Sequence, residues 1–140
     1  MSPSGRSGMP DVKTLVNAYR TGVFPMARGR NDPGIDWHMG VTTTQDGEIL
    51  RAFLPLESLH ISGSLRKVLR RRPYTVEADR DFPAVIRACA DMKRPDSQGT
   101  WINDAIIDSF TALHRAGIAH SMECRDSSGT LVGGVYGVAV

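Results

Sequence analysis

The segment SLRKVLRRR, residues 64–72, concentrates positive charge without one acidic residue. Its cations are Arg66, Lys67, Arg70, Arg71 and Arg72. Residues three and four apart lie side by side on a helix, so the spacing predicts one basic face suited to following a phosphate backbone. The alternative is an ordinary solvated face, with cations favoured near the negative end of the helix dipole. These residues alone leave both interpretations open.

Trp37 and Trp101 are the only tryptophans, and both stand beside turn-forming sequence. Indole rings stack on exposed bases, and each such contact is worth roughly 1–3 kcal/mol in recognition of single-stranded nucleic acid. The alternative is a pair of partly buried core aromatics. The placement of the two residues is compatible with either role.

Other reactive residue types form no complete catalytic set. The four histidines lack metal-ligand spacing, and no nucleophile-elbow motif accompanies them. His120 and Glu123 occupy alternate sides of a predicted strand, so we expect them to face opposite ways instead of forming an acid/base pair. Cys89 and Cys124 lie far apart and outside any CxxC spacing, which favours free thiols over a disulfide or metal site.

The sequence pattern before residue 57 indicates a small N-terminal module. Asp11 can cap a helix whose apolar positions recur at helical spacing and which ends near Gly22. The Gly/Pro-rich stretch 27–47 predicts irregular loops and turns, and 48–56 predicts an extended segment ending in a proline. We therefore place a domain boundary near Glu57, with 1–10 as a flexible tail, 11–56 as the module and 57–140 as a second domain.

The order of helix and strand patterns in the second domain predicts an α+β fold. The expected order is a helix at 64–72 capped by Ser62 or Ser64, a strand at 74–78, a helix opened by Asp81, a helix at 101–116, and two antiparallel strands joined by DSSG. Three apolar residues of the first helix, Leu65, Val68 and Leu69, predict a buried stripe. The helix opened by Asp81 is expected to bury Phe82, Val85, Ile86 and Cys89.

The last predicted strand, LVGGVYGVAV, is nearly all apolar. Such a pattern is typical of a central strand covered on both faces. We therefore expect Val140 to lie inside a buried central strand, and we expect more chain to complete the sheet.

Composition is that of a soluble globular protein. The 140 residues are 41% hydrophobic with a net charge of +2. No run approaches the roughly 20 apolar residues that cross a bilayer, and the N-terminus lacks the apolar core of a secretory signal. We expect a cytoplasmic protein without a membrane partner.

Several strings together resemble the leucyl/phenylalanyl-tRNA protein transferase family. AYRTGVFPM resembles that family's AYRxGIFPW motif, and LHISGSLRKVLRRRPYTVEAD resembles its FHISRSLRKxLRRxPFxVTxD segment. VIRACA, GTWI, LHRAGIAHSMEC and LVGGVYGVA follow in the family's order and spacing.

The resemblance implies a small N-terminal module and the first part of a GNAT-like acyltransferase domain, with no metal or organic cofactor. The implied reaction transfers Leu or Phe from aminoacyl-tRNA to the N-terminal Arg or Lys of a protein, marking it for degradation, by an enzyme expected to be a monomer. Trp37 and Trp101 match the residues that hold the terminal adenosine of the tRNA. The implied tRNA-backbone contacts are Arg66, Lys67, Arg70 and Arg71. Val135 matches a residue of the apolar aminoacyl pocket.

This sequence departs from the family pattern in places. The usual WWSPDPR is IDWHMG, which puts Asp36 where the first tryptophan stands, and Met26 replaces the tryptophan of the N-terminal motif. The Gly-Glu-Ser-Met-Phe and Asp-Cys-Gln motifs, which carry the family's catalytic groups, are not among the 140 residues. The resemblance places them beyond Val140, so we expect no catalytic residue within this chain. A non-catalytic module that binds an RNA end, or a degenerate fragment, is therefore the alternative to an active transferase.

Overall fold

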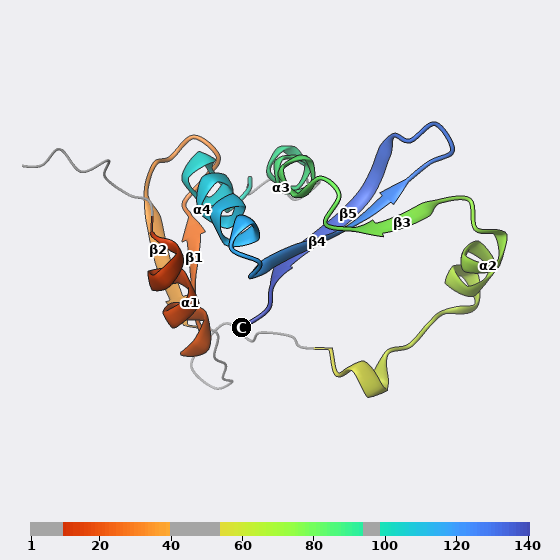
Figure 1. The fold of residues 1–140 in the computed structure, drawn as a ribbon, viewed down its shortest axis with the longest axis horizontal. Coiled ribbons are helices and arrows are strands. Elements are labelled where there is room, and N and C mark those ends of the chain that lie inside the picture. Colours follow the sequence, from red (N-terminus) through yellow and green to blue (C-terminus); the bar gives the residue numbers. More distant parts are fainter. Residues whose placement is uncertain (1–9, 40–53, 94–98) are drawn as a thin grey trace, which may run out of the picture.

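The computed structural model describes residues 10–39, 54–93 and 99–140. Within them lie four α-helices and two antiparallel sheets (Figure 1), which confirms the α+β class. The elements are α1 (Val12–Arg20), β1 (Val23–Ala27), β2 (Ile35–Met39), the short 3-10 helix η1 (Leu56–Ser58), α2 (Gly63–Arg71), β3 (Thr75–Ala78), α3 (Phe82–Asp91), α4 (Asp104–Arg115), β4 (Ala119–Arg125) and β5 (Leu131–Val138).

The first sheet is a hairpin of β1 and β2, paired from Val23 opposite Met39 to Ala27 opposite Ile35. The prediction of irregular structure was therefore wrong for the part of 27–47 that forms β2. Strand pairing is a long-range interaction, and the glycines and prolines of the connecting turn hid it in the sequence. The Asp32 carboxylate closes this turn by accepting a hydrogen bond from the Gly34 N–H at 2.7 Å. The expected extended segment 48–56 lies largely outside the described residues.

Helix starts follow side-chain caps. The Asp81 carboxylate accepts a hydrogen bond from the Ala84 N–H at 3.1 Å and opens α3 as predicted. Helix α4 begins at Asp104, so the predicted start at Trp101 was wrong. The reason is local: the Asn103 side chain accepts from the Ile106 N–H at 2.9 Å and is the actual cap.

The core lies between the helices α1, α3 and α4 and one face of the larger sheet (Figure 1). Phe82 and Phe110 are its largest fully buried side chains. Val85 and Ile86 are buried as predicted, whereas Cys89 is only partly buried and Ala90 takes its place in the core. The apolar stripes of three helices thus converge on one layer.

The larger sheet has the order β3-β4-β5, with both pairs antiparallel. Strand β4 is central and β5 lies at an edge of this described sheet, which is incomplete as expected; a central place for β5 in a completed sheet stays a prediction. Val132 and Val135 on β5 are 51% and 61% exposed. The side of the sheet away from the helices carries Val76, Met122 and Val135, and we call it the open face.

Val140 lies past the end of β5 and is 58% exposed. Val140 is therefore uncovered among the described residues, and its expected place in a central strand completed by further chain stays a prediction. The physical reason for the exposure is that β5 pairs with β4 on one side only among the described residues, and its pairing ends with Val138 opposite Ala119. One further bond, from the Ala139 N–H to the Ile118 carbonyl at 2.8 Å, holds the residue before Val140 beside the start of β4.

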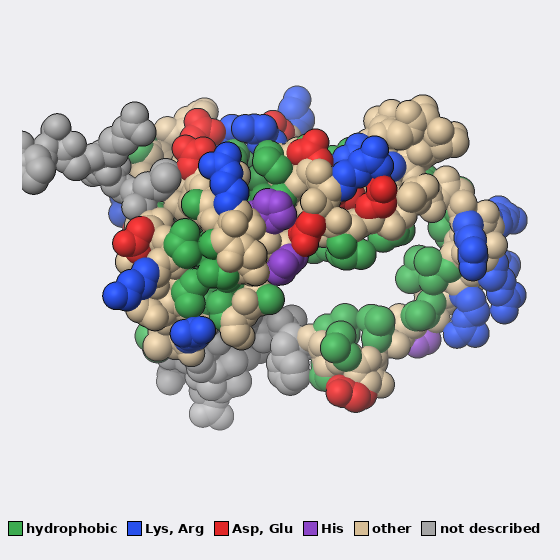
Figure 2. Space-filling view, viewed as in Figure 1, with side chains coloured by type: hydrophobic (Ala, Val, Ile, Leu, Met, Phe, Trp, Pro, Cys, Tyr) green, Lys and Arg blue, Asp and Glu red, His purple; other side chains and the backbone are tan. Residues whose placement is uncertain are grey.

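Helix α2 stands apart from this core, at the end of an arm that runs from η1 to β3 (Figure 1). It buries no residue, and Leu65, Val68 and Leu69 are 46%, 41% and 53% exposed. The predicted buried stripe was therefore wrong, because no described element lies close enough to cover it. Figure 2 shows the cations of α2 on the outer side of the arm and apolar side chains on its inner side, toward the open face.

Candidate functional site

An aromatic pocket of about 350 Å³ lies between α1, α3, α4 and β5. Its lining residues are Tyr19, Cys89, Trp101, Ile102, Phe110, Gly134, Val135, Tyr136, Gly137 and Val138. None of these lining residues carries a formal charge, and four are aromatic. We call this cavity the Trp101 pocket. Its size and chemistry suit a flat, largely uncharged group.

Trp101 is held in the wall of this pocket by its own backbone. Its carbonyl accepts a hydrogen bond from the Ala27 N–H of β1 at 2.8 Å, which ties the segment before α4 to the hairpin. The Thr100 hydroxyl accepts from the Ile102 N–H at 3.1 Å and fixes the turn on either side of Trp101. The indole is partly buried and packs against the core. The indole is therefore partly supported by the core and partly accessible.

Trp37 lies on β2 opposite Pro25 and is 44% exposed. It is not among the residues that line the Trp101 pocket. The two predicted stacking residues are connected through β1, because Pro25 pairs with Trp37 and Ala27 bonds to Trp101. The structure thus places them on adjoining segments but not in one cavity.

Asp36 and Met26, the two departures from the family pattern near Trp37, face each other across the hairpin. The Asp36 carboxylate accepts two hydrogen bonds from the Arg28 guanidinium, both at 2.8 Å. This hydrogen bonding holds the pKa of Asp36 below its ordinary value. Both side chains are largely exposed, so the pair contributes little stability. Asp36 therefore forms an exposed ion pair at a position where the family pattern has an aromatic ring.

The basic face of α2 exists as predicted. Ser62 caps the helix by accepting from the Leu65 N–H at 3.2 Å, and Arg72 ends it in the left-handed conformation with φ 47°. Among the described residues, no ion pair within 4.0 Å involves a cation of α2. The four predicted backbone contacts are all exposed. Their charge is thus available to an anionic partner.

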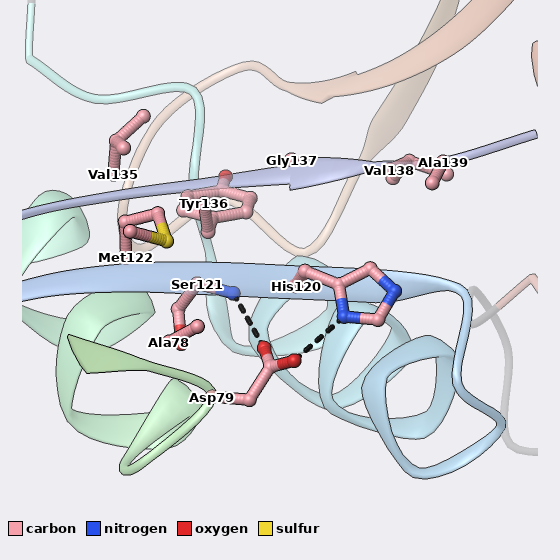
Figure 3. A pocket seen from close by; sticks show the side chains of 10 residues that line it. All are labelled: Ala78, Asp79, His120, Ser121, Met122, Val135, Tyr136, Gly137, Val138 and Ala139. Atoms are coloured by element: carbon pink, nitrogen blue, oxygen red, sulfur yellow. Dashed lines mark hydrogen bonds and ion pairs between the residues drawn. The ribbon is translucent and has the colours of Figure 1, made fainter.

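A second, shallower pocket of about 430 Å³ lies on the open face (Figure 3). Val135 reaches it beside its strand partner Met122, and its side chain points away from the helices. Val135 lines both pockets, so it is a residue that connects them. The side-chain cavity implied for Val135 is thus open on this side.

Asp79 and His120 form the polar end of the open-face pocket, and their contact is not apparent from the sequence. The Asp79 carboxylate bonds to His120 Nδ1 at 2.7 Å and to the Ser121 N–H at 2.8 Å (Figure 3). Asp79 has φ 56°, a left-handed conformation that is uncommon for a residue other than glycine. The Asp79 N–H also donates to the Ser121 carbonyl at 3.0 Å, so Asp79 extends the contact between β3 and β4 by one residue.

Glu123 faces the opposite side of β4 from His120, as predicted, and is completely buried. Burial raises its pKa, but hydrogen bonds from the Asp81 N–H, Arg125 and Ser121 outweigh burial and leave the pKa lowered. The Asp81 bond is 2.7 Å and the Arg125 bond 3.1 Å. Glu123 therefore joins β4 to the start of α3 as a charged structural residue.

Two further classes of site are not found in the described part of the chain. Its His, Cys, Asp and Glu side chains form no group of three that could hold a metal ion. None of its helices is long and apolar enough to cross a membrane.

Comparison with known proteins decides the family. A family model described as leucyl/phenylalanyl-tRNA protein transferase matches residues 53–140, and the model of that family's N-terminal domain matches residues 8–39. This chain belongs to the leucyl/phenylalanyl-tRNA protein transferase family. The resemblance drawn from the sequence strings is thereby confirmed, and the family is one of aminoacyltransferases.

Individual relatives agree. A leucyl/phenylalanyl-tRNA–protein transferase of Dinoroseobacter shibae is 43% identical over 131 residues, which cover 94% of this chain and 52% of the relative. One from Rubrobacter xylanophilus is 47% identical over 126 residues, 90% of this chain and 58% of the relative. One from Salinibacter ruber is 46% identical over 136 residues, which cover 94% of this chain and 53% of the relative. The chain thus spans about half the length of these curated relatives.

Within this chain, sequence reasoning missed most residues of the Trp101 pocket. Trp101 and Val135 were predicted site residues and both line it, but Tyr19, Phe110 and Tyr136 were not singled out. Tyr19 and Phe110 belong to apolar helix stripes, which predict core packing. Tyr136 stands among glycines in a strand, and that spacing was the one available signal of a cavity.

Proposed function

We propose that this chain binds the aminoacylated 3′ end of a tRNA and takes part in transferring Leu or Phe to the N-terminal Arg or Lys of a protein. The observation that carries the proposal is the Trp101 pocket, an uncharged aromatic cavity in a member of this transferase family. Stacking in such a cavity favours a nucleobase, at roughly 1–3 kcal/mol per base.

In this proposal Trp101 contacts the terminal adenosine from inside the pocket. Trp37 stacks on the same adenosine from the exposed hairpin. Val135 contacts the aminoacyl side chain, for which the open face offers an apolar neighbour in Met122. Each buried methylene of Leu adds about 0.8 kcal/mol. An apolar surface thus favours Leu and Phe over polar amino acids.

The basic face of α2 is proposed to contact the tRNA backbone. Arg66, Lys67, Arg70 and Arg71 are exposed and have no acidic side chain within ion-pair distance among the described residues. Figure 1 shows α2 at the far side of the arm, apart from the helices α1, α3 and α4 that surround the Trp101 pocket, as a long ligand requires. This arrangement supports recognition of a whole tRNA over a free nucleoside.

The reaction replaces an ester by an amide. The α-amino nitrogen of the acceptor protein forms a bond to the ester carbonyl carbon, the bond to the ribose oxygen breaks, and that oxygen leaves with a proton as free tRNA. The acceptor then carries Leu or Phe at its N-terminus, which marks it for degradation.

A second candidate is a module that binds the RNA end without catalysing transfer. It is favoured by one observation: no carboxylate, imidazole or amine side chain lines the Trp101 pocket to act as a general base at neutral pH. Binding would then remain while chemistry is absent.

Two assays on the 140-residue chain separate these candidates. Calorimetry measures binding of 3′-leucylamino-3′-deoxyadenosine, a non-hydrolysable analogue of the aminoacyl end, and a transfer assay follows labelled Leu from Leu-tRNA to a peptide that starts with Arg. Binding with transfer supports the first candidate, and binding without transfer supports the second. A chain that is folded by circular dichroism but binds neither the analogue nor tRNA would overturn both.

A further inference from the structure

The hydroxyl of Tyr136 is buried and has no hydrogen-bond partner among the described residues. Its ring is fixed between two core aromatics, edge-to-face with Phe82 at a centroid distance of 5.8 Å and with Phe110 at 5.6 Å. The ring therefore cannot turn its oxygen to solvent without losing both of these ring interactions. The unpaired hydroxyl is held where it is.

An unpaired buried hydroxyl is costly. Leaving such a group without a partner destabilises the fold, and a phenylalanine would keep both ring interactions without that cost. Buried polar groups in folded proteins nearly always have a hydrogen-bond partner. An unpaired one therefore points to a bound ligand that supplies the partner. Tyr136 is thus a core aromatic with one polar atom that the core does not use.

Tyr136 is one of the residues that line the Trp101 pocket. Trp101, Tyr19 of α1 and Cys89 of α3 line the same pocket, and Tyr19 and Cys89 are the titratable groups that interact electrostatically with Tyr136. Burial, and then the nearby Cys89 and Tyr19, raise the pKa of Tyr136. The phenol therefore remains protonated at neutral pH and can donate a hydrogen bond.

We propose that Tyr136 is a base-recognition residue, whose hydroxyl donates a hydrogen bond to a ring nitrogen of the adenine held beside Trp101. The inference rests on the proposed function and adds to it a residue that reads the edge of the base. Stacking on Trp101 accepts any base, because every base offers a π face. A donor fixed in the pocket wall instead selects a base that offers an acceptor there.

The test uses Tyr136→Phe, which preserves ring packing. Calorimetry with 3′-leucylamino-3′-deoxyadenosine should show affinity weakened about 3–10-fold, as expected for one neutral hydrogen bond. The melting temperature of the free variant should stay equal or rise, since the unpaired hydroxyl is gone. Tyr74→Phe, at a 48% exposed tyrosine outside the pocket, is the matched control and should leave affinity unchanged.

Analogues of the same probe with adenine N1, N3 or N7 replaced by C–H identify the acceptor. One of them should bind the wild-type chain more weakly yet bind the Tyr136→Phe variant no more weakly than the parent analogue does, because the two changes remove the same bond. Equal affinity of Tyr136→Phe and wild type, or additive losses with all three analogues, would overturn the inference.

The Trp101→Ala variant distinguishes a wrong assignment of Tyr136 from a wrong proposed function. If the wild type binds, Trp101→Ala weakens binding and Tyr136→Phe does not, the nucleoside site stands and only base reading by Tyr136 is wrong. If the wild type does not bind the probe at all, both the proposed function and this inference are wrong.

Discussion

His120 on β4 and Asp79 at the end of β3 are joined by a hydrogen bond of 2.7 Å between Nδ1 and the carboxylate. The same carboxylate lies 3.8 Å from His114 Nδ1 on α4, so one acidic group faces two histidines. Hydrogen bonding and the charge of Asp79, together with the Gly117 backbone, raise the pKa of His120, and hydrogen bonds from His120 and Ser121 lower the pKa of Asp79. The stability of the folded chain therefore depends on pH through the Asp79–His120 pair.

The first prediction concerns stability against pH. The raised pKa of His120 gives stability that is complete below its unfolded value of 6.5 and is lost as pH rises through the folded pKa. The lowered pKa of Asp79 gives stability that is complete above 3.8 and is lost as pH falls through the folded pKa. The melting temperature should thus be higher at about pH 6 than at about pH 8.5, as measured by circular dichroism.

Asp79→Asn is the control for this pH dependence. Asparagine also adopts the left-handed conformation, so the backbone at φ 56° is retained while the charge is removed. The fall in melting temperature above neutral pH should become shallower in this variant. An unchanged pH profile would show that the Asp79 charge does not stabilise protonated His120.

The second prediction concerns Glu123, a carboxylate that is 0% exposed. Glu123→Ala should lower the free energy of unfolding by about 3 kcal/mol, because it removes the nearest carboxylate of Arg125 and leaves the Asp81 N–H without its side-chain acceptor. Glu123→Gln keeps the shape and should cost less. Urea denaturation provides the measurement, and Glu57→Ala at an exposed position is the control. A loss below about 1 kcal/mol for Glu123→Ala would contradict the structural role.

Local signals explain which parts of this fold the sequence predicts. Asp11 and Ser62 cap their helices through a side-chain oxygen three residues before the bonded N–H, at 2.7 and 3.2 Å. Such interactions depend on neighbours in the chain, so the sequence contains them. The start of α4 was misplaced because Trp101 and Ile102 are apolar and extended the helical pattern past the true cap, Asn103.

Long-range relations explain what the sequence missed. Strand β2 exists because it pairs with β1, and Leu65 on α2 is exposed because no described element covers it. In the candidate site, Trp101 and Val135 came from family motifs, but the unpaired Tyr136 hydroxyl and the Asp79–His120 hydrogen bond depend on how distant elements pack. Single-sequence patterns do not record such packing.

The third prediction tests the basic face of α2. Arg70→Gln with Arg71→Gln should weaken binding of Leu-tRNA and reduce the salt slope of log K by about 1 for each phosphate that the variant no longer neutralises. Affinities measured from about 50 to 200 mM salt give that slope. Arg87→Gln on α3 removes an exposed charge outside α2 and is the matched control. Equal slopes for the α2 variant and the Arg87 variant would mean that α2 is a solvated face only.

The fourth prediction compares two adjacent glycines of β5. A Cβ at Gly134 would lie 3.2 and 3.3 Å from the two methyl groups of Val85 and 3.3 Å from the Met122 carbonyl oxygen, whereas one at Gly133 meets only the Cys124 Cβ at 3.6 Å. Gly134→Ala should therefore lower the free energy of unfolding by about 1–3 kcal/mol through overpacking. Gly133→Ala should be neutral or slightly stabilising, because alanine loses less backbone entropy on folding.

A double variant locates the cause of this overpacking. Val85 is 1% exposed and belongs to the α3 face that packs on β5, so Val85→Ala alone leaves a cavity. Combined with Gly134→Ala, the added methyl occupies part of that space, and the double variant should lose less stability than the sum of the two single changes. Urea denaturation of the four chains measures the coupling. Strict additivity, or equal losses for Gly133→Ala and Gly134→Ala, would show that close approach of α3 does not require glycine at this position.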